Sequence, residues 1–181
     1  MRAELLDFDW HGYGLSVRDY EYTLRLVKNI IQDRIDHLPK RVEGAVGYDE
    51  NGNILSGTEI ENEVLDDLAY YTWIDNFYVC HFGLWRLQGI FEGILKQEFG
   101  LPENLPGLKK KFDTVLKQGY KIDKSQYDEI LLWSKIRNAL THNPPEAYKP
   151  HGLTIDDLSE YCDLVSGVTQ QLLDQKIKIM Q

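Results

Sequence analysis

Apolar residues recur at intervals of three and four positions through most of the chain, and the alternation typical of a β-strand is not sustained anywhere. This periodicity predicts an all-α protein of five to six helices. The first helix should begin at Ser16, with Asp19 three positions later, and end at Pro39. Its buried face should comprise Leu24, Val27, Ile31, Ile35 and Leu38.

The segment from Pro39 to Gly57 carries the signals of a turn. It holds four glycines, the turn sequence Asn51-Gly52-Asn53, and two short stretches with β-forming residues, GAVGY and ILSG. We expect a short loop or hairpin insertion near residues 39–57. Whether it acts as a lid, a hairpin or a passive loop stays open.

Helical periodicity returns after Thr58, which forms a capping-box pattern with Glu61, and continues to Phe99 without a proline. Glycines interrupt it at positions 83, 89 and 93. Residues 58–99 therefore form either two helices that meet near 73–77, or one long helix that bends and packs closely at its glycines. The second half is apolar on more than one face, which suits a central helix or a subunit interface.

Three further helices follow from local start and stop signals. One should run from about Leu108 to Gln118, and Gly119 ends it. A second should start near Ser125 and stop by Asn143, because two prolines follow. The last begins after Thr154, which with Asp157 provides a cap. A length of 181 residues fits one domain over 1–181.

The segment Arg137-Asn138-Ala139-Leu140-Thr141-His142 places chemistry at the end of a helix. At about 100° per residue, Asn138 and His142 share a face, whereas Arg137 is displaced from His142 by about 140°. Arg137 and His142 can converge if the last turn frays or tightens, or if a second copy of the motif faces the first across a two-fold axis. The negative end of the helix dipole favours protonated His142.

These three residue types are sufficient for RNA cleavage without a metal. An arginine provides a permanent planar cation that matches a phosphate, a histidine moves a proton, and an asparagine orients its neighbours. In that reaction the ribose 2′-hydroxyl attacks the adjacent phosphate, and Arg137 stabilises the charge that builds on its oxygens. No cofactor and no metal ligand set are expected, because the histidines lack ligand-like spacing.

The sequence RNALTH at 137–142 resembles the R-x4-6-H signature of HEPN domains, whose favoured form has a polar residue, often Asn, after the arginine. The motif ends a helix, precedes Asn-Pro, and is followed by one long amphipathic helix, as in that family. The resemblance is sharp over residues 130–173. It implies an up-and-down helical bundle, a homodimer with facing motifs, and a metal-independent endoribonuclease of toxin, antiviral defence or RNA-processing systems. Its site residues would be Arg137, Asn138 and His142.

The family also implies an alternative, a non-catalytic module that binds nucleotide, RNA or a protein partner such as an antitoxin or a nucleotidyltransferase. Simpler explanations compete at each residue. Arg137 could pair with Asp128 or Glu129 of its own helix, and His142 could cap its helix. His81 reads best as a hydrogen-bonded core or interface histidine. Core and interface packing is favoured over base stacking for the aromatic residues Tyr70, Tyr71, Trp73, Tyr78, Trp85 and Trp133.

The charge balance opposes broad nucleic-acid binding, since 29 acidic residues against 20 basic ones give a net charge of −9. The excess of acid is uneven: residues 107–137 hold eight basic and four acidic residues, a local charge of +4. The run Lys109-Lys110-Lys111 is then either a solvated helix face or a phosphate-contacting rim beside the motif.

Targeting and redox signals point to the cytoplasm. The N-terminal residues MRAELLDFDW lack the apolar core of a secretory signal, and no stretch reaches the roughly 20 apolar residues of a membrane span. Two cysteines, Cys80 and Cys162, are too few for a disulfide scaffold. We expect a cytoplasmic protein with an RNA substrate and no membrane association.

Overall fold

The computed structural model describes residues 15–53, 59–142 and 152–180, and this part of the chain forms an all-α bundle of six helices. The helices are α1 (Arg18–Asp36), α2 (Leu38–Val46), α3 (Glu59–Phe99), α4 (Leu108–Lys117), α5 (Lys124–His142) and α6 (Ile155–Met180). The predicted fold class, an all-α bundle of five to six helices, is confirmed.

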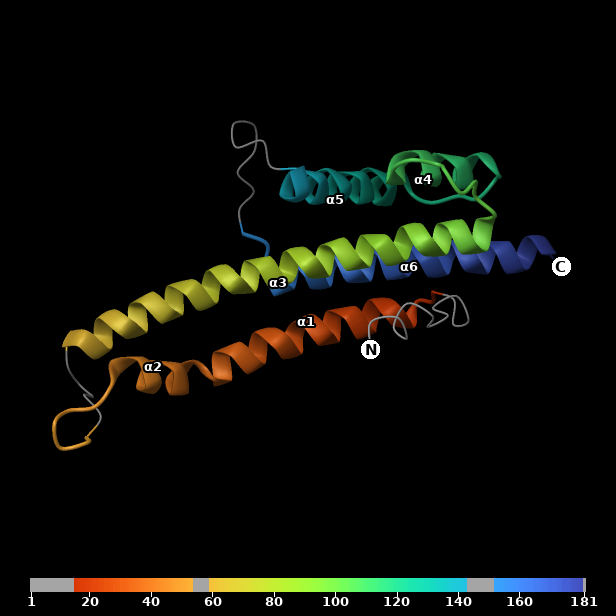
Figure 1. Ribbon diagram of the computed structural model, residues 1–181. Helices are drawn as coiled ribbons and strands as arrows, with labels where there is room; N and C mark the ends of the chain where they lie inside the picture. The colour runs from red at the N-terminus through yellow and green to blue at the C-terminus, as the bar shows by residue number, and fades with distance from the viewer. Residues whose placement is uncertain (1–14, 54–58, 143–151, 181) are drawn as a thin grey trace, which may run out of the picture.

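The long helix α3 is the centre of the bundle. α1 and α6 pack on it and on each other, and α4 and α5 pack along its carboxy-terminal half. Figure 1 shows α1, α3, α5 and α6 roughly antiparallel to one another in chain order, with α4 and α5 on one side of α3 and α1 and α2 on the other. The chain thus folds up and down around α3.

The predicted loop or hairpin at 39–57 is wrong for its first part, because residues 38–46 form α2. α1 ends at Asp36, before Pro39 is reached. Pro39 itself stands in the first turn of α2, where a missing N–H costs nothing. Val42 and Val46 bury one face of this short helix. α2 contacts α3 and, more weakly, α1. Residues 54–57, which include the ILSG stretch, lie outside the described residues.

The turn predicted at Asn51-Gly52-Asn53 is present. Asp49 Oδ1 accepts hydrogen bonds from the backbone N–H groups of Asn51 and Asn53, both at 2.8 Å. Gly52 has φ = 80°, a conformation that favours glycine. Asn53 Nδ2 also donates a hydrogen bond to Asp49 Oδ2 at 3.0 Å, and this bond, together with the backbone bonds, stabilises the charged carboxylate and lowers the pKa of Asp49.

α3 is one helix of 41 residues, which settles the choice between one helix and two. Its glycines permit close approach: a Cβ at Gly83 would lie 2.6 Å from Cδ2 of Leu158 and 2.9 Å from Cγ2 of Val27. A Cβ at Gly93 would lie 2.3 Å from Cδ1 of Leu15. Gly83 is therefore the position at which α1 and α6 both press against α3.

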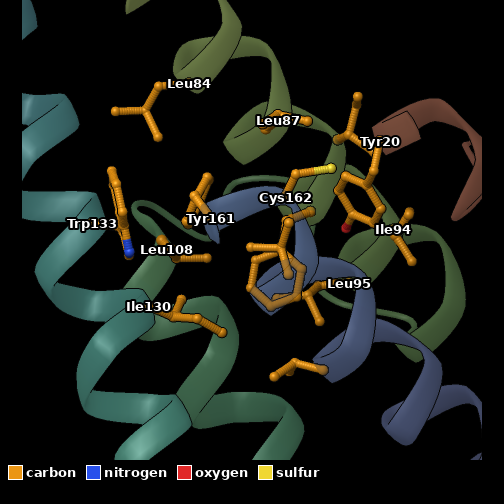
Figure 2. Packing of buried hydrophobic residues seen from close by; sticks show 14 of the residues in the cluster. Tyr20, Leu84, Leu87, Ile94, Leu95, Leu108, Ile130, Trp133, Tyr161 and Cys162 are labelled. Carbon is orange, nitrogen blue, oxygen red and sulfur yellow. The ribbon is translucent and has the colours of Figure 1, made fainter. Parts of the chain in front are cut away.

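The core lies between the carboxy-terminal half of α3 and its four neighbours. Figure 2 shows Tyr20, Leu87, Ile94 and Cys162 converging where α1, α3 and α6 meet, with Ile130 and Trp133 of α5 on the other side of Tyr161. Both cysteines are buried and free, and burial raises the pKa of each thiol to about 11. No described helix combines the length and apolar character required to span a membrane.

The cap predicted for the last helix is also present. Thr154 Oγ1 accepts a hydrogen bond from the Asp157 N–H at 3.2 Å, and Asp157 Oδ2 accepts one from the Thr154 N–H at 2.8 Å. At the first helix, Asp19 Oδ2 accepts from the Ser16 N–H at 2.7 Å, and α1 begins two residues after Ser16.

Candidate functional site

The RNALTH segment forms the last turn and a half of α5, which is helical through His142. Thr141 Oγ1 donates a hydrogen bond to the Arg137 carbonyl at 2.9 Å. The last turn does not fray within the described residues, so Arg137 and His142 keep the separation of an ideal helix, about 140°. The structure describes the backbone of His142 but not its side chain.

The Arg137 side chain is held from two directions. Its Nη1 donates to Asn138 Oδ1 at 2.9 Å, and its Nη2 lies 3.4 Å from Oε1 of Glu92. Its Nε is buried and has no hydrogen-bond partner among the described residues. The structure therefore brings together two of the three predicted site residues, Arg137 and Asn138, and adds an acid that the sequence did not indicate.

Glu92 of α3 is the point at which three helices meet. Its carboxylate forms ion pairs with Arg137 of α5 and Lys111 of α4. It also accepts a hydrogen bond at 2.8 Å from Gln88 Nε2 of its own helix. Only 15% of the Glu92 side chain is exposed, against 24% for Arg137 and 18% for Lys111. Arg137 is thus paired across helices, and not with an acid of α5 as one sequence interpretation had it.

One signal could have pointed to Glu92. It is the only acidic residue between Asp75 and Glu98, and the stretch 84–95 around it is apolar except for Arg86 and Gln88. A lone acid in a largely buried stretch is found where a partner of opposite charge meets it, because an unpaired buried charge is costly. The partner, however, is 45 residues away in the sequence.

A groove of about 620 Å³ opens beside this cluster, along the outer face of α3. It is lined by Phe82, Trp85, Arg86, Gly89, Glu92, Gly93, Lys96, Lys111 and Arg137. Four of these residues are cationic and one is acidic, so the groove carries a formal charge of +3 in a chain whose net charge is −9. Such a concentration of positive charge favours an anionic ligand.

A second, smaller hollow of about 190 Å³ adjoins the groove. Its lining consists of His81, Phe82, Trp85, Arg137, Leu140 and Thr141. Phe82, Trp85 and Arg137 line both spaces. Arg137 therefore stands at their junction, with the cationic groove on one side and the end of α5 on the other.

The three lysines of the run 109–111 have different surroundings. Lys109 forms an i,i+4 ion pair with Asp113 at 2.6 Å on an exposed helix face. Lys110 is exposed as well, whereas Lys111 turns into the groove and pairs with Glu92. Of the three lysines, Lys111 alone lines the groove beside Arg137.

His81 differs from the hydrogen-bonded core residue that the sequence favoured. It is half-buried, and its Nε2 is buried without a hydrogen-bond partner among the described residues. Burial lowers the pKa of its imidazole. Of the other histidines, His37 hydrogen-bonds Asp33 of its own helix, and His11 and His151 lie outside the described residues.

The aromatic residues were predicted to pack in the core or at an interface, and Trp133 is the one of the six that packs in the core, its ring tilted against that of Tyr161 with 8% of the residue exposed. The others present more than half of their surface to solvent: Tyr70, Tyr71, Trp73, Tyr78 and Trp85. Core packing is therefore wrong for these five. In the described ranges, no group of three or more histidine, cysteine or acidic side chains could hold a metal ion.

No protein-family model, curated protein or solved structure matches this chain. Its function is therefore inferred from the chemistry of the groove and of the segment 137–142.

Proposed function

We propose that this protein is a metal-independent endoribonuclease of the HEPN type, which cleaves RNA by attack of the 2′-hydroxyl on the neighbouring phosphate. The observation that carries the proposal is the position of Arg137. Its guanidinium is fixed by Asn138 and Glu92 at the edge of a groove that holds three further cations. A fixed planar cation in a positive groove is suited to bind a phosphodiester.

In the proposed reaction the 2′-hydroxyl loses its proton as its oxygen bonds to phosphorus, the bond from phosphorus to the 5′-oxygen breaks, and that oxygen takes up a proton. Arg137 stabilises the negative charge on the phosphate oxygens, and His142 transfers a proton. Asn138 accepts from Nη1 and so orients the guanidinium. The products are a 2′,3′-cyclic phosphate and a free 5′-hydroxyl.

The proposal includes a homodimer. Because α5 stays helical to its last residue, His142 projects from a different side of the helix than Arg137. A second copy related by a two-fold axis can bring its own motif to face the first. Tyr71 and Tyr78, each more than half exposed, lie on the groove side of α3 and offer that copy an aromatic contact surface.

The second candidate is a non-catalytic module that binds a nucleotide or RNA. The ion pair between Glu92 and Arg137 favours it, because part of the arginine's charge is already neutralised within the protein. In this case the groove would bind an anion but leave it intact.

Cleavage of labelled tRNA or mixed RNA in excess chelator distinguishes the two candidates. The wild type should produce 2′,3′-cyclic phosphate ends. Arg137→Ala should lower the rate by about 10²- to 10³-fold, the usual effect of removing one charge-stabilising donor. His142→Ala should lower it by about 10²- to 10⁴-fold, as expected for a general acid or base.

Arg25→Ala and His37→Ala are the matched controls. Both residues are on α1 or at its end, outside the groove, and both variants should cleave as the wild type does. Purified wild type that binds RNA but leaves a wide range of RNAs uncleaved would favour the binding module. Equal cleavage by all four variants would reveal a contaminating nuclease and refute the assignment of the site.

A further inference from the structure

Two large aromatic side chains stand free beside the cations of the groove. Trp85 is 55% exposed and Phe82 is 71% exposed. Among the described residues neither ring has an aromatic neighbour, in contrast to Trp73, which meets Phe77 edge-on at 4.3 Å, and to Trp133 near Tyr161. Exposed rings without a partner on the wall of a charged groove have a face available for a ligand.

The position of Trp85 is defined by its neighbours. It lines both the cationic groove and the small hollow at the end of α5, as does Arg137. A phosphate bound at Arg137 would therefore have Trp85 directly beside it. Lys96, which lies further along α3, and Lys111 of α4 line the same groove.

The floor of the groove is open at this point. A Cβ at Gly89 would meet no atom within 4 Å, and Gly89 follows Trp85 by one helical turn on the same face of α3. With a volume of about 620 Å³, the groove has room for a group larger than a phosphate. Its walls combine cations for an anion with π-surfaces for a flat ring.

A nucleotide with an unpaired base has both of these properties. In a duplex the bases are stacked on one another and cannot reach a protein ring, whereas a single strand can place each base against an aromatic side chain. A simple inorganic anion would use the cations but leave Trp85 without a role.

We propose that Trp85 forms a base-stacking subsite for the nucleotide next to the cleaved phosphate, with Lys96 and Lys111 binding that nucleotide's own phosphate. The substrate is therefore single-stranded RNA at this position. This inference rests on the proposed ribonuclease function, since Arg137 marks the cleaved phosphate. It reverses the sequence-based preference for a packing role of Trp85.

The test is binding of a short, fluorescein-labelled, fully 2′-O-methylated single strand, which cannot be cleaved because its 2′-oxygens carry no proton. Fluorescence anisotropy gives the affinity. Trp85→Ala should weaken binding by about 5- to 150-fold, the range for loss of one stacked base. Trp85→Phe, which retains a ring, should recover most of the loss. Trp73→Ala is the matched control, since Trp73 is 54% exposed on the same helix but does not line the groove.

The lysines are tested by the salt dependence of the same binding reaction. Lys96→Gln and Lys111→Gln should each reduce the slope of log affinity against log salt by about 0.7, the value for one phosphate contact in a single strand. Lys110→Gln should leave the slope unchanged, because Lys110 belongs to the same lysine run but does not line the groove.

Several outcomes would overturn the subsite. A Trp85→Ala variant that binds the methylated strand as tightly as the wild type refutes stacking. Equal sensitivity of a double-stranded RNA to Trp85→Ala refutes the preference for a single strand. A Trp85→Ala variant that turns from dimer to monomer in light scattering shows that a second copy covers the ring, and this also refutes the subsite.

Failure of the ribonuclease proposal gives a different pattern. If the wild type does not cleave natural RNA but binds the methylated strand through Trp85, the subsite is supported and the ribonuclease proposal is refuted. If the wild type cleaves RNA but Trp85→Ala leaves the affinity for the methylated strand unchanged, the ribonuclease proposal is supported and the subsite is refuted.

Discussion

The two halves of α3 have different surroundings, although they belong to one helix. Residues 80–99 carry the centre of the core, with eight apolar side chains buried: Cys80, Leu84, Leu87, Ile90, Phe91, Ile94, Leu95 and Phe99. In residues 61–79 only Thr72 is buried. Figure 1 shows the reason, because the amino-terminal part of α3 extends past α5 and α6 and is accompanied by α2 and the end of α1.

The exposed half is nevertheless rich in apolar side chains. Leu65, Tyr70, Tyr71, Trp73 and Tyr78 are each 41% to 58% exposed. A helix that needed only solubility would carry polar residues at such positions. The contrast shows that one half of α3 buries its apolar side chains in the core, whereas the other leaves large apolar side chains on the surface. The groove beside Arg137 runs along the covered half, from Phe82 to Lys96.

The largest expected effect comes from the same substitution made in each half. Leu87→Ala should lower the free energy of unfolding by about 2–5 kcal/mol, because Leu87 is fully buried and its removal leaves a cavity. Leu65→Ala should change it by about 0.5 kcal/mol or less, since Leu65 is 41% exposed. The midpoint of urea denaturation measures both. Equal losses would show that the amino-terminal half is packed as tightly as the core, and the comparison would break down.

Alanine substitutions at two glycines in the first part of the covered half should have intermediate effects on stability, of opposite sign. Gly83→Ala forces a methyl group toward Leu158 and Val27, both buried, and should destabilise by about 1–3 kcal/mol. Gly89→Ala meets no neighbour and should stabilise the helix by about 0.5–1 kcal/mol. Thermal unfolding should therefore shift in opposite directions for the two variants. Shifts in the same direction would mean that α1 and α6 do not press against α3 at Gly83.

Much of this fold could be predicted from local signals. The start of α6 was predictable because Thr154 and Asp157 satisfy each other's backbone groups, and the end of α4 because Gly119, with φ = 102°, can adopt a left-handed conformation. The error at α2 has a physical origin as well. A proline stops a helix that precedes it but is equally suited to the first turn of the next one, and the periodicity of nine residues is too short to decide.

The site was less predictable, because its contacts join distant parts of the chain. The motif indicated Arg137 and Asn138, but the partner Glu92 and the position of Lys111 depend on how α4 and α5 pack on α3. Periodicity shows which face of a helix is apolar. It does not show whether another element covers that face, and for this reason Trp85 and Trp133 could not be told apart.

The smallest expected effect concerns pH and His81, the second residue of the covered half. Burial lowers the pKa of its imidazole below the ordinary value of about 6.5, so the unfolded chain binds the proton more tightly than the folded one. Its contribution to stability is therefore complete above about pH 6.5 and is lost as the pH falls through the folded pKa. Two neighbours face it: Tyr78, at 6.0 Å between ring centres, and Arg137, which lines the same hollow.

His81→Gln should flatten this part of the pH dependence, because glutamine does not titrate. The free energy of unfolding, measured by urea denaturation at intervals from pH 8 to pH 5, should fall less steeply in the variant than in the wild type. A variant that instead falls more steeply would mean that folding favours the charged imidazole. In that case His81 would sit in a polar, open setting like the amino-terminal half of α3, and the boundary between the halves would lie closer to Leu84.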